Sequence, residues 1–228
     1  MASVIITGIS GNLGSAVAKQ FLNEGAKVTG TYTGNKPDGF DGTSCKLYSV
    51  DLTNEDAAQK FVQQYLADEQ QVDVAVLTVG GFTMGNIDST TASDLTKQIS
   101  LNFYTAYNIA RPVFTAMKAR GRGRIFLIGS LAGAHPAQSK STIAYGMSKS
   151  MLFSLASMLN AEAGDTNVVT SIVVPSTIDT KQNRAAMPDA DPSTWVKAEQ
   201  IAQVISWYSG EAAEKIRQPV IYLTGKRI

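Results

Sequence analysis

The chain has 228 residues, in which Lys and Arg number 20 and Asp and Glu number 19, so its net charge is close to zero. This balance gives no electrostatic footprint for nucleic acid or an acidic membrane surface, and no apolar segment approaches the length of a membrane span. A single cysteine, Cys45, excludes an intramolecular disulfide, and the N-terminus carries no basic leader, so we expect a cytoplasmic protein.

Short apolar runs alternate with amphipathic stretches along the chain. Most runs are rich in β-branched residues, which is typical of parallel strands covered on both faces. Strands are predicted, in chain order, at Val4 to Thr7, Lys27 to Tyr32, Lys46 to Val50, Asp73 to Thr78, Arg124 to Gly129, Val168 to Val174 and Val220 to Leu223. Helices are predicted between them, at Leu13 to Glu24, Asn54 to Asp68, Ala92 to Lys118, Ala144 to Ala163 and Ala198 to Ser209.

This alternation predicts a three-layer, doubly wound α/β fold, in which a parallel sheet with right-handed crossovers carries helices on both faces. No linker divides the chain, so we assign one domain to residues 1–228. The segment from Pro175 to Pro192 holds three prolines, and we expect a mobile loop near a ligand there. The basic residues Arg120, Arg122 and Arg124 are expected in a solvated loop that leads into a strand.

Residues 7–14, with the sequence Thr-Gly-Ile-Ser-Gly-Asn-Leu-Gly, follow the first strand directly and open the first helix. Such a turn brings backbone N–H groups to a pyrophosphate at the positive end of a helix. An ordinary glycine-rich connection is the alternative, but the strand–turn–helix context favours a dinucleotide. The residues of this turn expected at the cofactor are Gly8, Ser10, Asn12, Leu13 and Gly14.

The end of the second strand bears on which dinucleotide binds. An acid there would bind the ribose 2′-hydroxyl of NAD, but residues 30–34 read Gly-Thr-Tyr-Thr-Gly and the first acid is Asp38. The absent carboxylate favours NADP(H) over NAD(H), with Lys36 either a partner of the 2′-phosphate or simply solvated. Tyr32 is expected at the cofactor. Asp51-Leu52, after the third strand, either meet the adenine or begin a turn.

Tyr145 and Lys149 lie four residues apart and therefore on one face of a helix. An ammonium beside a phenol lowers the pKa of the phenol from about 10, so the tyrosine can exchange a proton near neutral pH. Ser130 follows a strand at the edge where open parallel sheets bind ligands, and it either stabilises charge on a substrate oxygen or merely forms a turn. Asn102 is an interior polar residue of the predicted central helix, where asparagine is mildly unfavourable.

The order of these features resembles the short-chain dehydrogenase/reductase family over essentially the whole chain. The resemblance implies a Rossmann-like fold, a nicotinamide cofactor and a small-molecule substrate. It implies that Tyr145 is the proton donor, that Ser130 orients the substrate oxygen and that Asn102 holds a water relay behind Lys149. Lys149 itself is expected to bind the nicotinamide ribose and to lower the pKa of Tyr145. The further cofactor contacts that it implies are Val79, Gly80, Gly81, Tyr145, Lys149, Pro175, Ile178 and Thr180.

Three departures from the family pattern are visible. Gly11 comes one position early in the glycine turn, Leu77-Thr78-Val79-Gly80 replaces Asn-Asn-Ala-Gly, and Pro175-Ser176 replaces Pro-Gly. The second and third departures are similar to the dihydropteridine reductase branch, which reduces a quinonoid dihydropterin. Gly80-Gly81-Phe82 and the segment Asn183-Arg184 with Met187-Pro188-Asp189 add to that local resemblance.

We therefore expect an NAD(P)H-dependent oxidoreductase that reduces a small carbonyl substrate by hydride transfer, with Tyr145 as proton donor. Reduction of a quinonoid pterin is one alternative, and a non-catalytic dinucleotide-binding sensor or scaffold is an alternative of another class. The only histidine, His135, has no partner ligands in the sequence, so no metal site is expected. Long helices in this family commonly form subunit contacts, which implies a homodimer or homotetramer.

Overall fold

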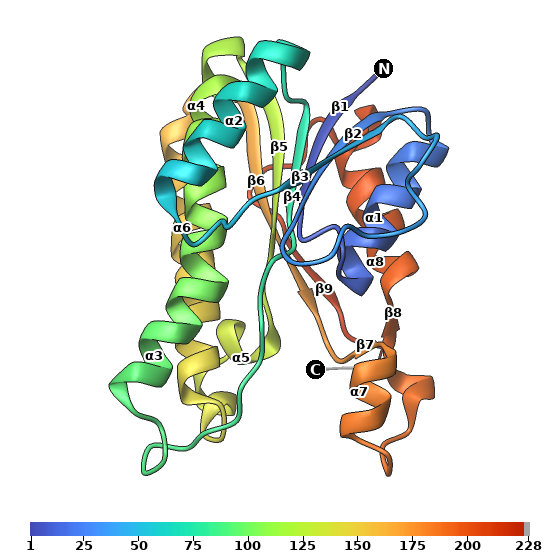
Figure 1. Cartoon of the computed structure of the whole chain (residues 1–228). Helices are drawn as coiled ribbons and strands as arrows, with labels where there is room; N and C mark the ends of the chain where they lie inside the picture. Colours follow the sequence, from blue (N-terminus) through green and yellow to red (C-terminus); the bar gives the residue numbers. More distant parts are fainter. Residues whose placement is uncertain (226–228) are drawn as a thin grey trace.

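The computed structural model describes residues 1–225, and at its centre lies a parallel sheet of seven strands (Figure 1). The strands lie in the order β3-β2-β1-β4-β5-β6-β9. Their bounds are β1 (Ser3–Thr7), β2 (Lys27–Tyr32), β3 (Cys45–Ser49), β4 (Val74–Leu77), β5 (Arg122–Ile128), β6 (Asn167–Pro175) and β9 (Val220–Leu223). The seven strands and the three-layer, doubly wound α/β fold predicted from the sequence are confirmed.

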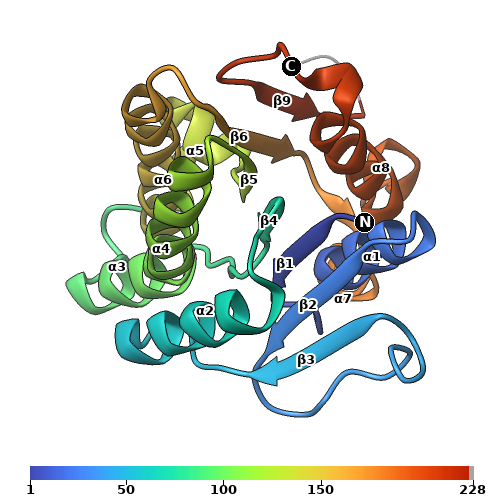
Figure 2. The same ribbon diagram turned by 90° about the horizontal axis from the view of Figure 1, so that it is seen from above.

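Helices cover both faces of the sheet, because alternate residues of a strand point to opposite faces. In β1, Val4 and Ile6 pack toward α1 (Asn12–Asn23) and α8 (Ala198–Ser209), whereas Ile5 packs into the other layer. Figure 2 shows helices on both sides of the sheet, with α1 and α8 together on one of them. Burial of each such side chain contributes about 1.5–3 kcal/mol. The other layer consists of α2 (Glu55–Glu69), α4 (Thr105–Arg120) and α6 (Ile143–Ala163).

The single helix predicted from Ala92 to Lys118 is interrupted by a π-helical turn. The chain forms α3 (Ala92–Ile99), then the π turn η1 (Ser100–Tyr104), then α4. In the π turn, the N–H of Thr105 donates to the carbonyl of Ser100, five residues back, so one extra residue is accommodated. The prediction of one continuous α-helix is therefore wrong here. The extra residue turns the polar side chain of Asn102 into the protein, where its amide is 1% exposed.

The segment from Pro175 to Pro192, where a mobile loop near a ligand was expected, contains short elements of secondary structure, and its mobility remains a prediction. Within it, β7 (Ile178–Asp179) pairs with β8 (Val196–Lys197), and α7 (Lys181–Ala186) begins after Thr180. Asp179 accepts two hydrogen bonds from Arg184, at 2.7 and 2.9 Å, which fix the start of α7 to the strand before it. The remaining short elements are α5 (Leu131–Ala134) and the 3₁₀ turns η2 (Pro136–Ser139), η3 (Pro192–Thr194) and η4 (Glu211–Ala213).

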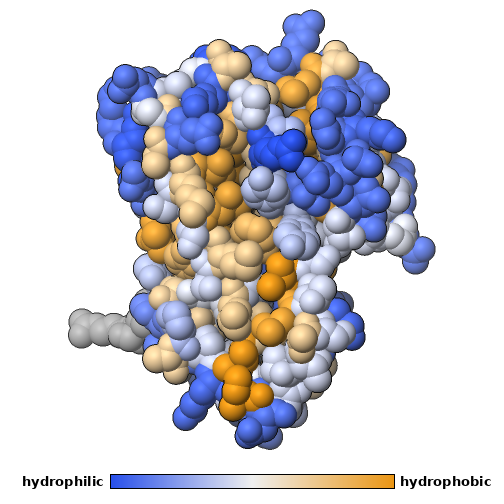
Figure 3. All heavy atoms as spheres, turned by 90° about the vertical axis from the view of Figure 1, so that its left-hand side faces the viewer, coloured by the Kyte–Doolittle hydropathy of each residue, from blue (hydrophilic) through white to orange (hydrophobic). Residues whose placement is uncertain are grey.

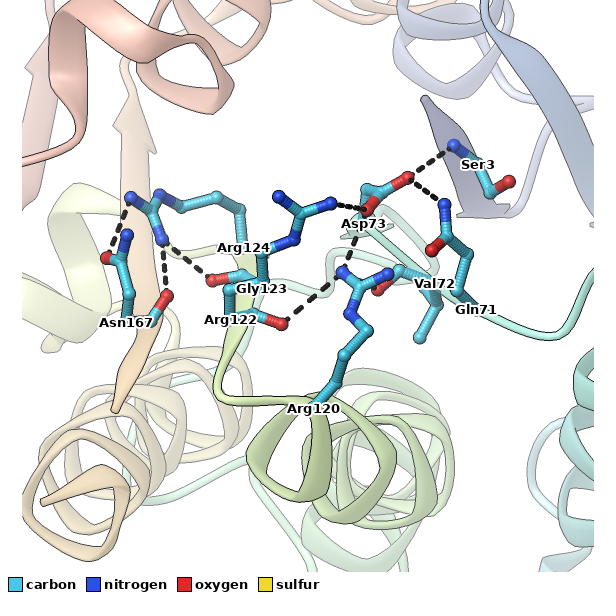
Figure 4. A network of polar contacts seen from close by, with 9 residues as sticks. All are labelled: Ser3, Gln71, Val72, Asp73, Arg120, Arg122, Gly123, Arg124 and Asn167. Atoms are coloured by element: carbon cyan, nitrogen blue, oxygen red, sulfur yellow. Dashed lines mark hydrogen bonds and ion pairs between the residues drawn. The ribbon is translucent and has the colours of Figure 1, made fainter. Parts of the chain in front are cut away.

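Arg120, Arg122 and Arg124 do not lie in a solvated loop, because Arg120 ends α4 and the other two lie in β5. At the amino-terminal edge of the sheet, the carboxylate of Asp73 accepts a hydrogen bond from Arg120 Nη2 at 2.8 Å (Figure 4). Arg124 is 8% exposed, and its guanidinium donates to the backbone oxygen of Asn167 at 2.7 Å. Only Arg122 keeps a largely exposed side chain. Hydrogen bonds offset part of the lost hydration of the other two guanidinium groups, although Arg120 Nε and Nη1 are buried without a hydrogen-bond partner.

The sheet runs without a break from β3 to β9, and both hydrophobic layers pack on it. None of the helices in residues 1–225 is long and apolar enough to cross a membrane. The assignment of one domain to residues 1–228 remains a prediction, because residues 226–228 lie outside the described part of the chain.

Candidate active site

The carboxyl-terminal ends of β1, β4 and β5 meet at one edge of the sheet, because all the strands are parallel. After β1 the chain passes to α1 on one face, and after β4 it passes to α3 on the other. Strand order therefore reverses between β1 and β4, which is where open parallel sheets bind ligands. Gly8, Gly80 and Ser130, all predicted at the site, follow the ends of these three strands.

The glycine turn after β1 has the geometry of a phosphate site. Gly8 has a φ of +66°, a left-handed conformation that side chains with a Cβ rarely adopt. Gly11 N donates to Gly8 O at 2.9 Å and closes the turn, while a Cβ on Gly14 would collide with Gly8 O. No side chain caps α1, so the first backbone N–H groups, those of Asn12 and Leu13, point out of the helix without a capping partner. These features fit a pyrophosphate at the positive end of α1. Ser10 lies exposed in the same turn.

The segment after β4 lies between this turn and the proposed catalytic residues. A Cβ on Gly8 would lie 3.0 Å from a methyl of Val79, so the two turns are in contact. A Cβ on Gly80 would lie 2.6 Å from Asn102 Oδ1 and 3.1 Å from Lys149 Nζ. The backbone at Gly80 thus approaches both side chains without room for a larger residue. This brings the predicted contacts at residues 79–81 to the place where the nicotinamide end of a dinucleotide would lie.

Ser130, Tyr145 and Lys149 come together from two elements that meet at the sheet edge. Ser130 follows β5 and is 7% exposed, and its Oγ accepts a hydrogen bond from Gly133 N at 3.0 Å, so it also caps α5. Tyr145 and Lys149 lie one turn apart on α6. Lys149 is 5% exposed, and its Nζ donates to the carbonyl of Ile128, the last residue of β5, at 2.8 Å. Ser130 therefore forms a turn, which was one of its two possible roles, and it also lies beside Tyr145.

Burial dominates the acid–base properties of this pair. The pKa of Tyr145 is raised above its ordinary value because the phenol is buried, and the hydrogen bond with Ser130 acts in the opposite direction. Burial lowers the pKa of Lys149 from 10.5 to about 8. The lowered tyrosine pKa expected from the Tyr-x-x-x-Lys spacing is not found, because desolvation of the buried phenol raises its pKa. The Lys149 ammonium donates to Ile128 O.

Asn102 holds the Gly80-Gly81 turn in place. Gly81 N donates to Asn102 Oδ1 at 2.9 Å, and Asn102 Nδ2 donates back to Gly81 O at 3.0 Å. The amide also donates to Ser148 Oγ at 3.0 Å, next to Lys149 on α6. One side chain in the π turn therefore connects two segments of the site. The water relay behind Lys149, which the resemblance implied, remains a prediction.

The predicted adenine-side residues lie at the ends of β2 and β3, on the far side of β1 from β5. Tyr32 ends β2 and is half-buried. Asp51 Oδ1 accepts hydrogen bonds from Thr53 N at 2.9 Å and Thr53 Oγ1 at 2.6 Å, which lower the pKa of the carboxyl. Asp51 thus begins a turn, one of the alternatives left open. Leu52 is 4% exposed, and its carbonyl accepts a hydrogen bond from Asn108, so its side chain belongs to the core.

The segment that begins at the end of β6 reaches the glycine turn from the other side. Pro175 ends β6, Ile178 lies in β7, and the Thr180 hydroxyl accepts a hydrogen bond at the start of α7. Asn12 Nδ2 donates to Gln182 Oε1 at 3.0 Å, which ties α7 to the first residue of α1. The three predicted contacts therefore belong to a segment held beside the phosphate turn. Gln182 is not among the predicted contacts, because an exposed glutamine in a six-residue helix carries no sequence pattern.

Phe82 is a second residue that sequence reasoning did not place at the site. Its ring lies 5.0 Å from that of Tyr145, edge to face, although 62% of the residue is exposed. An exposed aromatic ring against the proposed proton donor is suited to contact a ligand. Within residues 1–225, no group of three or more His, Cys, Asp or Glu side chains is arranged to hold a metal ion.

Lys149→Met is expected to change the pH dependence of stability. Because the pKa of Lys149 is about 8 when folded and 10.5 as its ordinary value, the unfolded chain binds more protons between these pH values, and this group makes stability rise with pH across that window. Urea unfolding at about pH 7 and about pH 10 should show the wild type gaining roughly 2–3 kcal/mol relative to Lys149→Met. The exposed Lys60→Met should show no such change. If the difference in unfolding free energy between the wild type and Lys149→Met is the same at both pH values, the lowered pKa of Lys149 is contradicted.

Comparison with known proteins identifies the family to which this chain belongs. The sequence model of the family described as short chain dehydrogenase matches residues 2–191. The 3-oxoacyl-acyl-carrier-protein reductase MabA of Mycobacterium avium is 28% identical over 184 residues, which cover 80% of this chain and 69% of MabA. The uncharacterized oxidoreductase YvrD of Bacillus subtilis is 28% identical, over 93% of this chain and 91% of its own. The cyclic-di-GMP-binding biofilm dispersal mediator protein of Escherichia coli is 27% identical, over 92% of this chain and 90% of its own.

Solved structures share the fold. ElxO with NADP bound superposes with a TM-score of 0.90 at 21% identity, covering 98% of this chain and 97% of ElxO. The ligand-free aldohexose dehydrogenase of Thermoplasma acidophilum gives a TM-score of 0.87 at 22% identity, covering 98% and 92%. Because the family model matches residues 2–191, which are most of the sequence, this chain belongs to the short chain dehydrogenase family.

Proposed function

We propose that this protein is an NAD(P)H-dependent reductase of a small carbonyl substrate. The observation that carries the proposal is the convergence of Ser130, Tyr145 and Lys149 at the edge of the sheet where an uncapped glycine turn opens α1. A purely structural use of this edge would not require an ammonium buried against a strand carbonyl, because burial of a cation costs free energy. Membership of an oxidoreductase family supports the same conclusion.

The residues divide the chemistry among them. The nicotinamide, when bound, supplies a hydride to the carbonyl carbon of the substrate. Tyr145 donates its phenolic proton to the carbonyl oxygen, and its raised pKa keeps the phenol protonated at neutral pH. Ser130 donates a hydrogen bond to the same oxygen and stabilises the charge that develops there. Lys149, whose pKa is about 8, is mainly protonated at neutral pH and binds the ribose hydroxyls.

Apolar side chains near the site favour a ketone with an apolar or aromatic substituent. Phe82 and Met84 are 62% and 66% exposed, and their loop is tied to the start of α6 by pairing of Gly85 with Thr142. Met187, 39% exposed, follows α7. The name of the MabA relative, a 3-oxoacyl reductase, supports a ketone substrate. Reduction of a quinonoid dihydropterin is the alternative that local sequence resemblance offers, and the relatives described above give it no support.

The proposed cofactor is NADP(H) in preference to NAD(H). No carboxylate stands at the end of β2, where it would bind the 2′-hydroxyl of NAD. Lys36, in the loop that follows, is exposed and pairs with Asp41 at 2.9 Å. A phosphate on the ribose would compete with Asp41 for this ammonium. The NADP bound in ElxO agrees with this preference but, at 21% identity, bears on the fold alone.

A non-catalytic sensor is the proposal of another class, and one observation favours it. The Escherichia coli relative is named for binding cyclic-di-GMP and for mediating biofilm dispersal, and not for an oxidoreductase activity. This chain resembles that relative about as closely as it resembles MabA, at 27% and 28% identity. The discriminating property is turnover, because a sensor binds its nucleotide without hydride transfer and gains nothing from the proton donor Tyr145.

We also propose that the protein is a cytoplasmic homodimer or homotetramer. Figure 3 shows hydrophobic side chains gathered along the face formed by α3, α4 and α6. The large exposed residues from η1, α4 and α6 are Tyr104, Tyr107, Met147 and Met158, of which Met158 is 68% exposed. An apolar helical face of this kind suits a second copy of the chain. The single cysteine suits a reducing compartment.

Tyr145→Phe is expected to abolish reduction. Because the ring is kept and only the proton-donating hydroxyl is lost, kcat should fall roughly 10²- to 10⁴-fold, while the Kd of NADPH should stay within about twofold. NADPH oxidation would be followed with a panel of ketones and quinonoid dihydropterin, and Tyr48→Phe at the sheet edge serves as the control. Undiminished kcat in Tyr145→Phe would rule out the acid role. No turnover by the wild type, despite tight nucleotide binding, would favour the sensor.

Lys36→Ala tests the proposed cofactor preference. The wild type should bind NADPH more tightly than NADH, and loss of the ammonium should weaken NADPH binding roughly tenfold, which corresponds to one hydrogen bond with a charged group. Binding of NADH should not change. Titration calorimetry with both nucleotides measures this, with the exposed Lys60→Ala as control. Equal weakening for both nucleotides would contradict a role at the 2′-phosphate.

Met158→Lys tests the oligomer. Light scattering of the wild type after size exclusion should give the mass of two or four chains. A charge placed on the apolar face should dissociate that contact, because an unpaired buried ammonium is costly. Gln63→Lys, on the exposed side of α2, should leave the mass unchanged. A monomeric wild type would refute the proposal.

A further inference from the structure

Three polar side chains form a buried cluster behind the site. Gln98 lies in the last turn of α3, Asn102 in the π turn and Ser148 in α6, and they are 8%, 1% and 0% exposed. Asn102 Nδ2 donates to Gln98 Oε1 at 2.8 Å and to Ser148 Oγ at 3.0 Å. Ser148 Oγ in turn donates to the carbonyl of Tyr145 at 2.8 Å. The cluster therefore runs from the end of α3 to the backbone of the proposed proton donor.

Gln98 is not needed to satisfy the hydrogen-bonding capacity of Asn102. An asparagine amide has two N–H groups, and Gly81 O and Ser148 Oγ already supply an acceptor for each. Gln98 adds a third acceptor, and it makes the shortest bond of the three. Burial of the Gln98 amide costs hydration, although neither N–H group of Asn102 lacks another acceptor. A role other than simple satisfaction is therefore indicated.

That role is to select one orientation of the Asn102 amide. In the observed orientation Oδ1 accepts from Gly81 N, and the NH₂ group faces Gln98 Oε1. After a flip, Oδ1 would face the Gln98 oxygen and the Gly81 carbonyl, and the NH₂ group would face the Gly81 N–H, so three like pairs would be opposed, one of them through Gln98. The acceptor on Gln98 thus disfavours the flipped state, in which the Gly81 backbone would be released.

The Gly81 backbone matters because of what lies beside it. The neighbouring Gly80 packs so closely on Asn102 Oδ1 and Lys149 Nζ that a Cβ there would lie 2.6 and 3.1 Å from them. A shift of this turn would therefore displace the wall nearest to Lys149. Small displacements of this kind in a catalytic site cost large factors in rate.

We propose that Gln98 is a positioning residue, which holds the Asn102 amide in the one orientation that fixes the Gly80-Gly81 turn against Lys149. This inference rests on the proposed function for its effect on rate. Its effect on the Gly81 backbone is independent of any activity. Gln98 touches neither substrate nor cofactor and acts only through Asn102.

The test compares Gln98→Met with the wild type and with Gln63→Met, a matched change at an exposed position of α2. The first readout is amide hydrogen exchange by NMR. Exchange at Gly81, whose N–H bonds to Asn102, should become roughly tenfold faster in Gln98→Met, while Phe126 in the core strand β5 should not change. The second readout is kinetic: kcat for ketone reduction should fall roughly tenfold with the Kd of NADPH within about twofold.

Gln98→Glu should restore both readouts, because a carboxyl group offers the same acceptor oxygen in either protonation state. Unchanged exchange at Gly81 in Gln98→Met, or a Gln98→Glu variant as impaired as Gln98→Met, would overturn the inference. Equal acceleration at Gly81 and Phe126 would also overturn it, since that result means general loosening. If the wild type turns over no substrate, the proposed function fails, and the Gly81 exchange still decides the role of Gln98.

Discussion

Every strand of the sheet runs in the same direction, and the rest of the molecule follows from that constraint. Parallel neighbours cannot be joined by tight hairpins, so each connection must cross back over the sheet. Helices make these connections, except between β2 and β3, where the loop of residues 33–44 does so. All carboxyl ends then lie at one edge, and the residues that follow β1, β4 and β5 become neighbours despite long separations in the chain. Gly8, Gly80 and Ser130 meet for this reason.

The second requirement is a place for polar groups inside a helical layer that is otherwise apolar. The π turn at residues 100–104 provides it, because one extra residue swings Asn102 inward without ending the helix. An amide in that position is tolerated only if its hydrogen bonds are complete, and here the Gly81 backbone and Ser148 complete them. The π turn is therefore what places a polar side chain inside the site.

Strands and most helices were predictable, because β-branched runs and helical periodicity are local properties. The glycine turn and the Tyr145–Lys149 pair were predictable as a pattern, since spacing alone places those groups. The π turn was not predictable, because a helical periodicity over 27 residues, Ala92 to Lys118, hides one added residue. The guanidinium groups of Arg120 and Arg124 looked solvated because their partners, Asp73 and Asn167, are distant in sequence.

The acid–base properties of the site show a similar limit. Sequence spacing indicates that an ammonium and a phenol share a helix face, but it does not give the depth at which they are buried. In this structure burial determines both pKa shifts: it raises the pKa of Tyr145 and lowers that of Lys149. The partner of Lys149 is a strand carbonyl, Ile128 O, and no side-chain pattern marks a carbonyl.

The two edges of the sheet are built for different tasks. The amino-terminal edge is cross-linked by charges around Asp73 and by the bonds of Arg124, whereas the opposite edge consists of glycine turns and short elements such as α7. Fold stability and reactivity therefore depend on separate sets of residues at opposite ends of the same strands. A lineage that retains the charged residues at the amino-terminal ends of the strands can change the loops at the carboxyl-terminal ends one by one, and so acquire a new substrate while the fold stays stable.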